Sequence, residues 1–184
     1  MKTLARLSPI AALALAAAAA HAAGLKVASA DIAQGRTLPM RFVYKGFGCA
    51  GDNVSPQLSW SGAPAQTKSY AVTVYDPDAP TGSGWWHWTL VNIPATTTSL
   101  AAGAGSPDAK LPEGEVSGRN DFGTVGYGGA CPPVGDKPHR YRFTVWALKV
   151  PHLDVDANSS GALVGYMLHF NSLAHATLTA RYGR

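Results

Sequence analysis

Two polar clusters stand at the ends of predicted strands and carry side chains that can do chemistry. The first is Asp76-Pro-Asp-Ala-Pro80, followed by Trp85-Trp-His-Trp88. The second runs from Cys131-Pro-Pro133 to His139-Arg-Tyr141. Imidazoles together with accessible backbone N–H groups, such as those of Gly128-Gly-Ala130, make a receptor for a small anion. These clusters therefore predict a site for a phosphate or a carboxylate.

Each cluster also has a structural interpretation. Asp76 and Asp78 are residue types that form turns by accepting hydrogen bonds from their own backbone. The tryptophans can be packing residues. An isolated histidine at a strand end is usually structural, and His152, His169 and His175 are interpreted in that way. His87 and His139 act together only if the fold brings them into contact.

Catalytic alternatives remain open for the same residues. His87, His139 and Asp76 can form a metal site of two histidines and one carboxylate, or an acid–base pair for hydrolysis. No two of them have a spacing typical of metal ligands, and the sequence has no G-x-S-x-G motif. Ser83 lies in a predicted flexible turn. The sequence therefore favours a binding site without a metal or a nucleophile.

Period-two patterns predict the elements that position these residues. Because alternate residues of a strand share a face, His139 and Tyr141 are expected on the same side of theirs. Residues 101–112 are predicted to form a long flexible surface loop, and the X-Pro bonds around Asp78 can be cis. One helix is expected at 159–173. The predicted strands are 38–44, 70–75, 88–93, 141–148 and 174–182, which together favour a mainly β fold, a β-sandwich with small peripheral helices.

Composition excludes several classes of protein. The 184 residues match one domain. Charged residues make only 14% of the chain, and there are 20 Gly and 13 Pro. Few charges with many turn residues argue against a helical bundle or a coiled coil. Apolar residues make 46% and there are five Trp, which argues against disorder.

The first residues predict an export signal. Lys2 and Arg6 precede the apolar run 10–20, and Ala20-His21-Ala22 fits a cleavage site. The run is too short for a transmembrane helix. We expect a signal peptide at 1–22, a single domain at 23–184 and a periplasmic or secreted product. Loss of Lys2 and Arg6 lowers the formal net charge from +4 to +2, which argues against nucleic acid or an anionic membrane as the partner.

Two cysteines, Cys49 and Cys131, remain in the predicted domain. An even number of cysteines in an exported protein predicts a disulfide. Two free thiols with a ligand or redox role are the alternative. The spacing matches neither a C-x-x-C motif nor a zinc site.

The polar clusters resemble the phosphatidylethanolamine-binding protein family, also called the Raf kinase inhibitor-like proteins, in its bacterial branch. The resemblance extends from about Ala28 to Tyr182. Besides the two clusters, it includes Val91-Asn92, Gly46-Phe-Gly-Cys-Ala-Gly-Asp-Asn-Val-Ser-Pro56, Trp60-Ser-Gly-Ala-Pro64 and Arg119-Asn-Asp-Phe-Gly123.

The resemblance implies a Greek-key β-sandwich with a small anion pocket and no cofactor. Asp76 would accept a hydrogen bond from the ligand, the Cys131 N–H would donate one, and His87 would line the pocket. Cys131 stands where many members of the family have glycine, which would narrow the entrance. The shorter helix near the C-terminus makes lipid and kinase functions of the eukaryotic branch transfer poorly. The residues expected in the binding site are Asp76, Asp78, Pro80, His87, Cys131, Pro132, His139 and Tyr141.

The functional prediction is a non-enzymatic exported protein that binds a small phosphate- or carboxylate-bearing ligand of the phospholipid head-group type. An interaction module that inhibits a partner kinase or protease is the alternative that the resemblance implies. A metal-dependent hydrolase is the third possibility.

Overall fold

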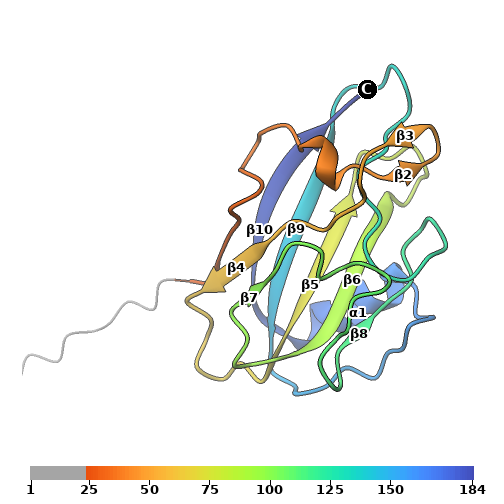
Figure 1. The fold of residues 1–184 in the computed structure, drawn as a ribbon. Coiled ribbons are helices and arrows are strands. Elements are labelled where there is room, and N and C mark those ends of the chain that lie inside the picture. Colours follow the sequence, from red (N-terminus) through yellow and green to blue (C-terminus); the bar gives the residue numbers. More distant parts are fainter. Residues whose placement is uncertain (1–23) are drawn as a thin grey trace, which may run out of the picture.

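A five-stranded antiparallel sheet is the main layer of the fold (Figure 1). The computed structural model describes residues 24–184, so the signal peptide predicted at 1–22 lies outside the described residues. The strand order is β10-β9-β5-β6-β8, which places β9 between β10, the next strand along the chain, and β5, which is distant from it in sequence. The strands are β5 (Ser69–Asp76), β6 (Trp85–Pro94), β8 (Val116–Ser117), β9 (His139–Leu148) and β10 (Ser172–Tyr182).

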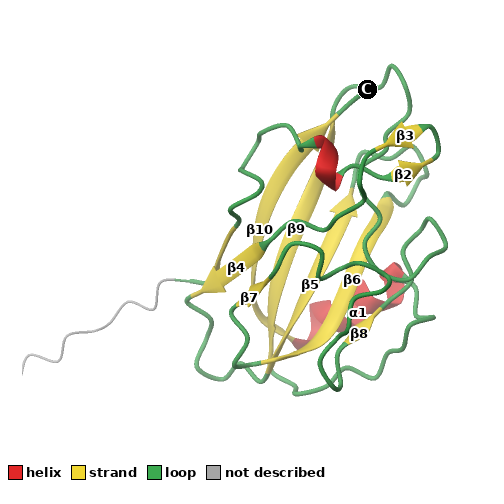
Figure 2. Ribbon diagram, viewed as in Figure 1, coloured by secondary structure: helices red, strands yellow, loops and turns green. Residues whose placement is uncertain are grey.

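A smaller sheet of order β1-β4-β7 lies in front of the main sheet and covers one face of it (Figure 2). Leu58 and Trp60 from β4 pack with Val72 and Phe143 of the main sheet in one core. Burial of each such side chain stabilises the fold by about 1.5–3 kcal/mol. The predicted mainly β fold is thus confirmed. The short strands are β1 (Lys26–Ala28), β4 (Leu58–Ser61), β7 (Ser99–Leu100) and a separate hairpin of β2 (Lys45–Gly46) and β3 (Cys49–Ala50).

Helix α1 (Gly161–Asn171) packs on the opposite face of the main sheet (Figure 1). It begins where the Ser160 side chain accepts a hydrogen bond from the Leu163 N–H at 3.2 Å. Such a bond is typical of an N-cap serine. Val164 and Leu168 bury their side chains against Leu148 and its neighbours. The helix expected at 159–173 is confirmed with slightly shorter bounds.

The strand predicted at 38–44 is wrong. This segment contains a 3-10 turn, Met40–Phe42, preceded by Pro39, which has no N–H to donate to a strand neighbour. Leu38 and Phe42 are buried while Met40 is 52% exposed. Val43 is buried as well, so the buried positions 38, 42 and 43 do not follow the period-two pattern of the sequence.

Two further expectations need correction. The predicted surface loop 101–112 has a packed centre, because Gly105 is buried and a Cβ there would lie 2.9 Å from Trp88. All peptide bonds of residues 24–184 are trans, so none of the X-Pro bonds near Asp78 is cis. Within the same range, no helix is long and apolar enough to span a membrane.

Candidate functional site: a cavity at one end of the main sheet

Three strand ends meet at one end of the main sheet and bring the two polar clusters together. β5 ends at Asp76, which pairs with Trp85 at the start of β6, and β9 begins at His139 on the other side of β5. A cavity of about 190 Å³ opens there. It is lined by Phe47, Asp76, Ala79, Pro80, Thr81, Trp85, His87, Phe122, Cys131, Pro132, Pro133, His139 and Tyr141.

A buried carboxylate–imidazole pair forms one side of this cavity. His139 Nδ1 lies 2.7 Å from Asp76 Oδ2, and both side chains are nearly inaccessible to solvent. The other Asp76 oxygen accepts the Asp78 N–H at 2.8 Å. Asp76 therefore closes its own turn and also holds His139 in place.

His87 lies beside this pair, on the neighbouring strand β6. Its Nδ1 lies 2.7 Å from the Gly128 carbonyl oxygen, and the Gly128 N–H donates back to the His87 carbonyl at 2.7 Å. The ring is buried, and this burial lowers the pKa of His87. His87 and Tyr141 meet edge to face, with ring centroids 5.1 Å apart.

Three polar side-chain atoms of the cavity wall are buried and have no hydrogen-bond partner: His87 Nε2, the Tyr141 hydroxyl and Trp85 Nε1. Burial, followed by the nearby Asp76 carboxylate, raises the pKa of Tyr141, so its hydroxyl stays protonated. An unpaired buried polar atom costs about 1–3 kcal/mol. Three such atoms around one cavity are a reason to expect a polar ligand there.

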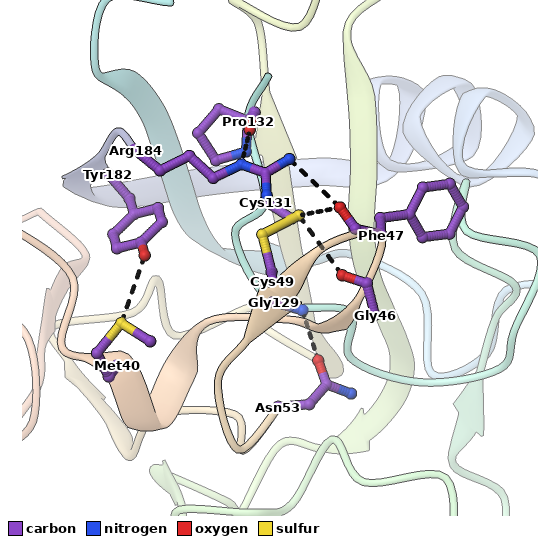
Figure 3. The surroundings of a disulfide bond; sticks show 10 residues. All are labelled: Met40, Gly46, Phe47, Cys49, Asn53, Gly129, Cys131, Pro132, Tyr182 and Arg184. Carbon is purple, nitrogen blue, oxygen red and sulfur yellow. Dashed lines mark hydrogen bonds between the residues drawn. A yellow bond between two sulfur atoms is a disulfide. The ribbon is translucent and has the colours of Figure 1, made fainter. Parts of the chain in front are cut away.

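The opposite side of the cavity is made by loops that the predicted disulfide joins. Cys49 in β3 and Cys131 are bonded (Figure 3). The Cys131 sulfur lies 3.6 Å from the Phe47 carbonyl oxygen, a contact without a hydrogen because a disulfide sulfur carries none. The hydrogen bonds of residues 24–184 include none from the Cys131 N–H to a backbone carbonyl.

Two polar side chains reinforce these loops. Asn53 Oδ1 accepts the Gly129 N–H at 2.7 Å, and its Nδ2 donates to the Tyr127 carbonyl at 3.1 Å. Arg184 donates from Nε to the Pro132 carbonyl at 2.6 Å and from Nη2 to the Phe47 carbonyl at 3.3 Å (Figure 3). The guanidinium therefore ties the same two loops that the disulfide joins.

Most of the expected site residues lie around the cavity, but Asp78 does not. Asp78 Oδ1 and Oδ2 accept hydrogen bonds from the Arg140 guanidinium at 2.6 and 2.8 Å, and Oδ2 also accepts the Arg140 N–H. This guanidinium lowers the pKa of Asp78 to about 2. Asp78 thus fastens the loop to β9 from outside the cavity. Asp76, Pro80, His87, Cys131, Pro132, His139 and Tyr141 line it.

The sequence did not indicate two aromatic residues of the cavity lining, Phe47 and Phe122, or one carboxylate that contacts His139. Phe47 and Phe122 lie with ring centroids 5.5 Å apart, and Trp85 packs edge-on against Phe122. Phe47 and Phe122 fall within segments quoted for the family resemblance, but no pattern in the letters marks them as lining. Asp136 Oδ2 lies 3.4 Å from His139 Nε2.

The metal site considered for His87, His139 and Asp76 does not form. Among residues 24–184 no group of three or more His, Cys, Asp or Glu side chains could hold a metal ion. His139 Nδ1 already contacts Asp76, and His87 Nδ1 already contacts the Gly128 carbonyl. One nitrogen of each ring, Nδ1, is therefore used to fix the wall.

Two packed sheets with a small cavity at one end of the main sheet define a β-sandwich protein with a pocket at that end. Residues 28–183 match the family described as Phosphatidylethanolamine-binding protein. The chain belongs to the phosphatidylethanolamine-binding protein family and is a binding protein of that family.

Its relatives include two proteins of Escherichia coli K12. The UPF0098 protein YbcL is 63% identical over 164 residues, which covers 89% of this chain and 90% of YbcL. The UPF0098 protein YbhB is 53% identical over 158 residues, covering 86% and 99%. The crystal structure of E. coli YbcL, described as a new member of the mammalian PEBP family, matches with a TM-score of 0.86 at 62% identity, covering 88% of this chain and 99% of YbcL.

Proposed function

We propose that this protein binds a small phosphate- or carboxylate-bearing ligand, of the phospholipid head-group type, in the cavity between His87, His139 and Tyr141. The observation that carries the proposal is the set of three unpartnered buried polar atoms on one cavity wall. A ligand oxygen can accept from the Trp85 N–H and the Tyr141 hydroxyl, which satisfies groups that otherwise stay unpaired. The Cys131 N–H is the backbone donor that we assign to the same ligand.

The remaining walls fit a ligand with a compact polar end. Phe47, Phe122 and Pro132 present apolar surface around the mouth. A cavity of about 190 Å³ accepts a phosphate or carboxylate group with a short substituent. No side chain of the cavity has the environment of an activated nucleophile, and we propose binding without chemical turnover.

We propose that the protein acts outside the cytoplasm, in the periplasm or after secretion, with 1–22 as a cleaved signal peptide and 23–184 as the mature domain. The Cys49–Cys131 disulfide supports this proposal because such bonds persist in oxidising compartments. N-terminal sequencing of the protein recovered from a periplasmic fraction tests it. A mature N-terminus near Ala23 is expected, and recovery of the uncleaved chain from the cytoplasm would contradict it.

Titration calorimetry with phosphate, phosphoethanolamine and acetate tests the binding proposal. We expect binding of at least phosphate at millimolar or lower concentration, and a loss of about tenfold or more in the His139→Ala variant. The matched control is His152→Ala, which changes a histidine away from the cavity. No binding of any of the three ligands would reject the proposal and favour the interaction module that inhibits a partner kinase or protease. Binding unchanged by His139→Ala would place the ligand elsewhere.

A further inference from the structure

The three unpartnered atoms of the cavity do not offer the same chemistry to a ligand. Trp85 Nε1–H can only donate a hydrogen bond, and the Tyr141 hydroxyl can donate or accept. His87 Nε2 donates or accepts according to the tautomer of the ring. The ligand that this cavity prefers therefore depends on where His87 carries its proton.

The backbone fixes that tautomer. The Gly128 carbonyl oxygen lies 2.7 Å from His87 Nδ1. Because a carbonyl oxygen can only accept, Nδ1 carries the hydrogen. Burial lowers the pKa of His87, which keeps the ring neutral. In a neutral ring with Nδ1–H, Nε2 holds a lone pair. His87 thus presents a buried acceptor to the cavity, and no described group donates to it.

The other ionisable groups near the ring do not supply this donor. They are Asp76 on β5, Asp121 in the loop before Phe122, and His139 and Tyr141 on β9. Asp76 and Asp121 favour a charged ring, but burial is the largest influence on it and acts in the opposite direction. His139 is engaged by Asp76 and faces Asp136. The Tyr141 hydroxyl itself has no partner.

An anion whose oxygens are all acceptors would therefore meet the His87 lone pair without a hydrogen between them. It would also enter beside the Asp76 carboxylate, which repels a second negative charge. A phosphoryl group that keeps one proton avoids the first cost and lessens the second, because its P–O–H can donate to Nε2. Its other oxygens remain free to accept from Trp85 and Tyr141.

We infer that the cavity selects a phosphoryl group that carries a proton, and discriminates against fully ionised anions of the same shape. This inference rests on the proposed function, since it requires an anion in this cavity. It favours inorganic phosphate and phosphomonoesters in their protonated form over sulfate, which has no O–H to donate.

Sulfate and phosphate provide the direct test, because they match in size and differ in that proton. With the wild-type protein at pH 7.5, titration calorimetry should show that phosphate binds at least about tenfold tighter than sulfate. The difference reflects the cost of leaving the buried His87 Nε2 acceptor unpaired in the sulfate complex. Equal affinity would overturn this inference while leaving the proposed function intact. Binding of neither anion would reject both.

Methyl phosphate extends the test along the pH scale. A phosphomonoester loses its second proton at about pH 6. Its affinity should therefore fall by about tenfold or more between pH 5.5 and 7.5. Inorganic phosphate, which keeps a P–O–H throughout, serves as the control for changes in the protein. A parallel pH response of the two ligands would overturn the inference.

Two variants separate the acceptor from the donors. In His87→Gln the side-chain amide can turn an N–H toward the anion, so the ratio of sulfate to phosphate dissociation constants should fall to within about threefold of one. Trp85→Phe removes a donor that serves both anions, so it should weaken both and leave their ratio near the wild-type value. A ratio unchanged in His87→Gln would contradict the role of Nε2. Should either variant fail to fold, the comparison of anions on the wild type still decides.

Discussion

The cavity has two walls built by different means. The strand wall comprises Asp76, His87, His139 and Tyr141 on β5, β6 and β9, and each of these side chains is nearly inaccessible to solvent. The loop wall comprises Phe47, Phe122, Cys131 and Pro132, and Phe47 is 70% exposed. The strand wall carries the polar atoms, while the loop wall carries mostly apolar surface.

The difference shows how a small β protein can keep unpaired polar atoms at fixed positions. Sheet hydrogen bonds on both sides of β5 fix the backbone of the strand wall. The loop wall has the short β2–β3 hairpin in place of long strands, and one disulfide and the hydrogen bonds of Asn53 and Arg184 reinforce it. Cross-links thus reinforce the cavity where sheet pairing is short.

The largest effect is expected from removing the disulfide of the loop wall. The double variant Cys49→Ser and Cys131→Ser loses a cross-link between residues 82 positions apart. In the chain-entropy account, this loss should reduce the free energy of unfolding by about 4–5 kcal/mol. Urea unfolding at pH 7 measures it. The wild type with reductant should behave like the variant. A loss below about 1 kcal/mol would show that the loop wall does not need the bond.

The next largest effect is expected from a substitution in the strand wall. Asp76→Asn removes the charge from a buried pair with His139. Loss of a buried hydrogen bond to a charged group costs about 1.5–3 kcal/mol. Asp136→Asn is the matched control, because it touches His139 from an exposed side at 3.4 Å. Loss of this exposed contact should cost about 0.5 kcal/mol or less. Urea midpoints of the two variants give the comparison. Equal losses would mean that burial of the pair contributes nothing.

A third change should stabilise the protein and weaken binding together. Tyr141→Phe removes a buried hydroxyl that has no partner. The empty protein should therefore gain about 1 kcal/mol in unfolding free energy. Phosphate affinity should fall by about fivefold or more, because a donor is lost. Thermal unfolding with and without phosphate measures both. A variant that is less stable without ligand would argue against an unpaired hydroxyl.

The smallest effect concerns the turn that leaves the strand wall. The Arg140 guanidinium lowers the pKa of Asp78 to about 2, below its usual 3.8. A carboxyl whose pKa is lower in the folded state than in the unfolded state stabilises the protein at pH values above its unfolded-state pKa. This stabilisation is lost as the pH falls through the folded-state pKa. Because the pair is partly exposed, Asp78→Asn should cost less than the pKa shift alone suggests, about 1 kcal/mol at most at pH 6. The cost should be smaller at pH 2 and vanish below it. Urea unfolding across this pH range checks the prediction, and a cost that stays constant would contradict it.

The strand wall was largely predictable from the sequence, whereas of the loop wall only Cys131, Pro132 and the disulfide were expected. Alternation in 141–148 placed Tyr141 and His139 on one face because period two is a local property of a strand, and the structure has them there. Asp76 and Asp78 have the same spacing, but β5 ends at Asp76 and the turn sends Asp78 to Arg140 outside the cavity. Phe47 and Phe122 meet only through contacts distant in sequence, which no local pattern encodes.

The position of β9 between β5 and β10 has a consequence for biosynthesis. Asp76 emerges from the ribosome 63 residues before its partner His139, and the hairpin of β5 and β6 alone has neither that partner nor Tyr141. Such long-range pairing is slow compared with hairpin formation. A nascent chain therefore has no site to offer until β9 has entered the sheet. A ligand added during refolding should bind only the finished sheet, and its affinity then adds to the stability of the whole chain by mass action.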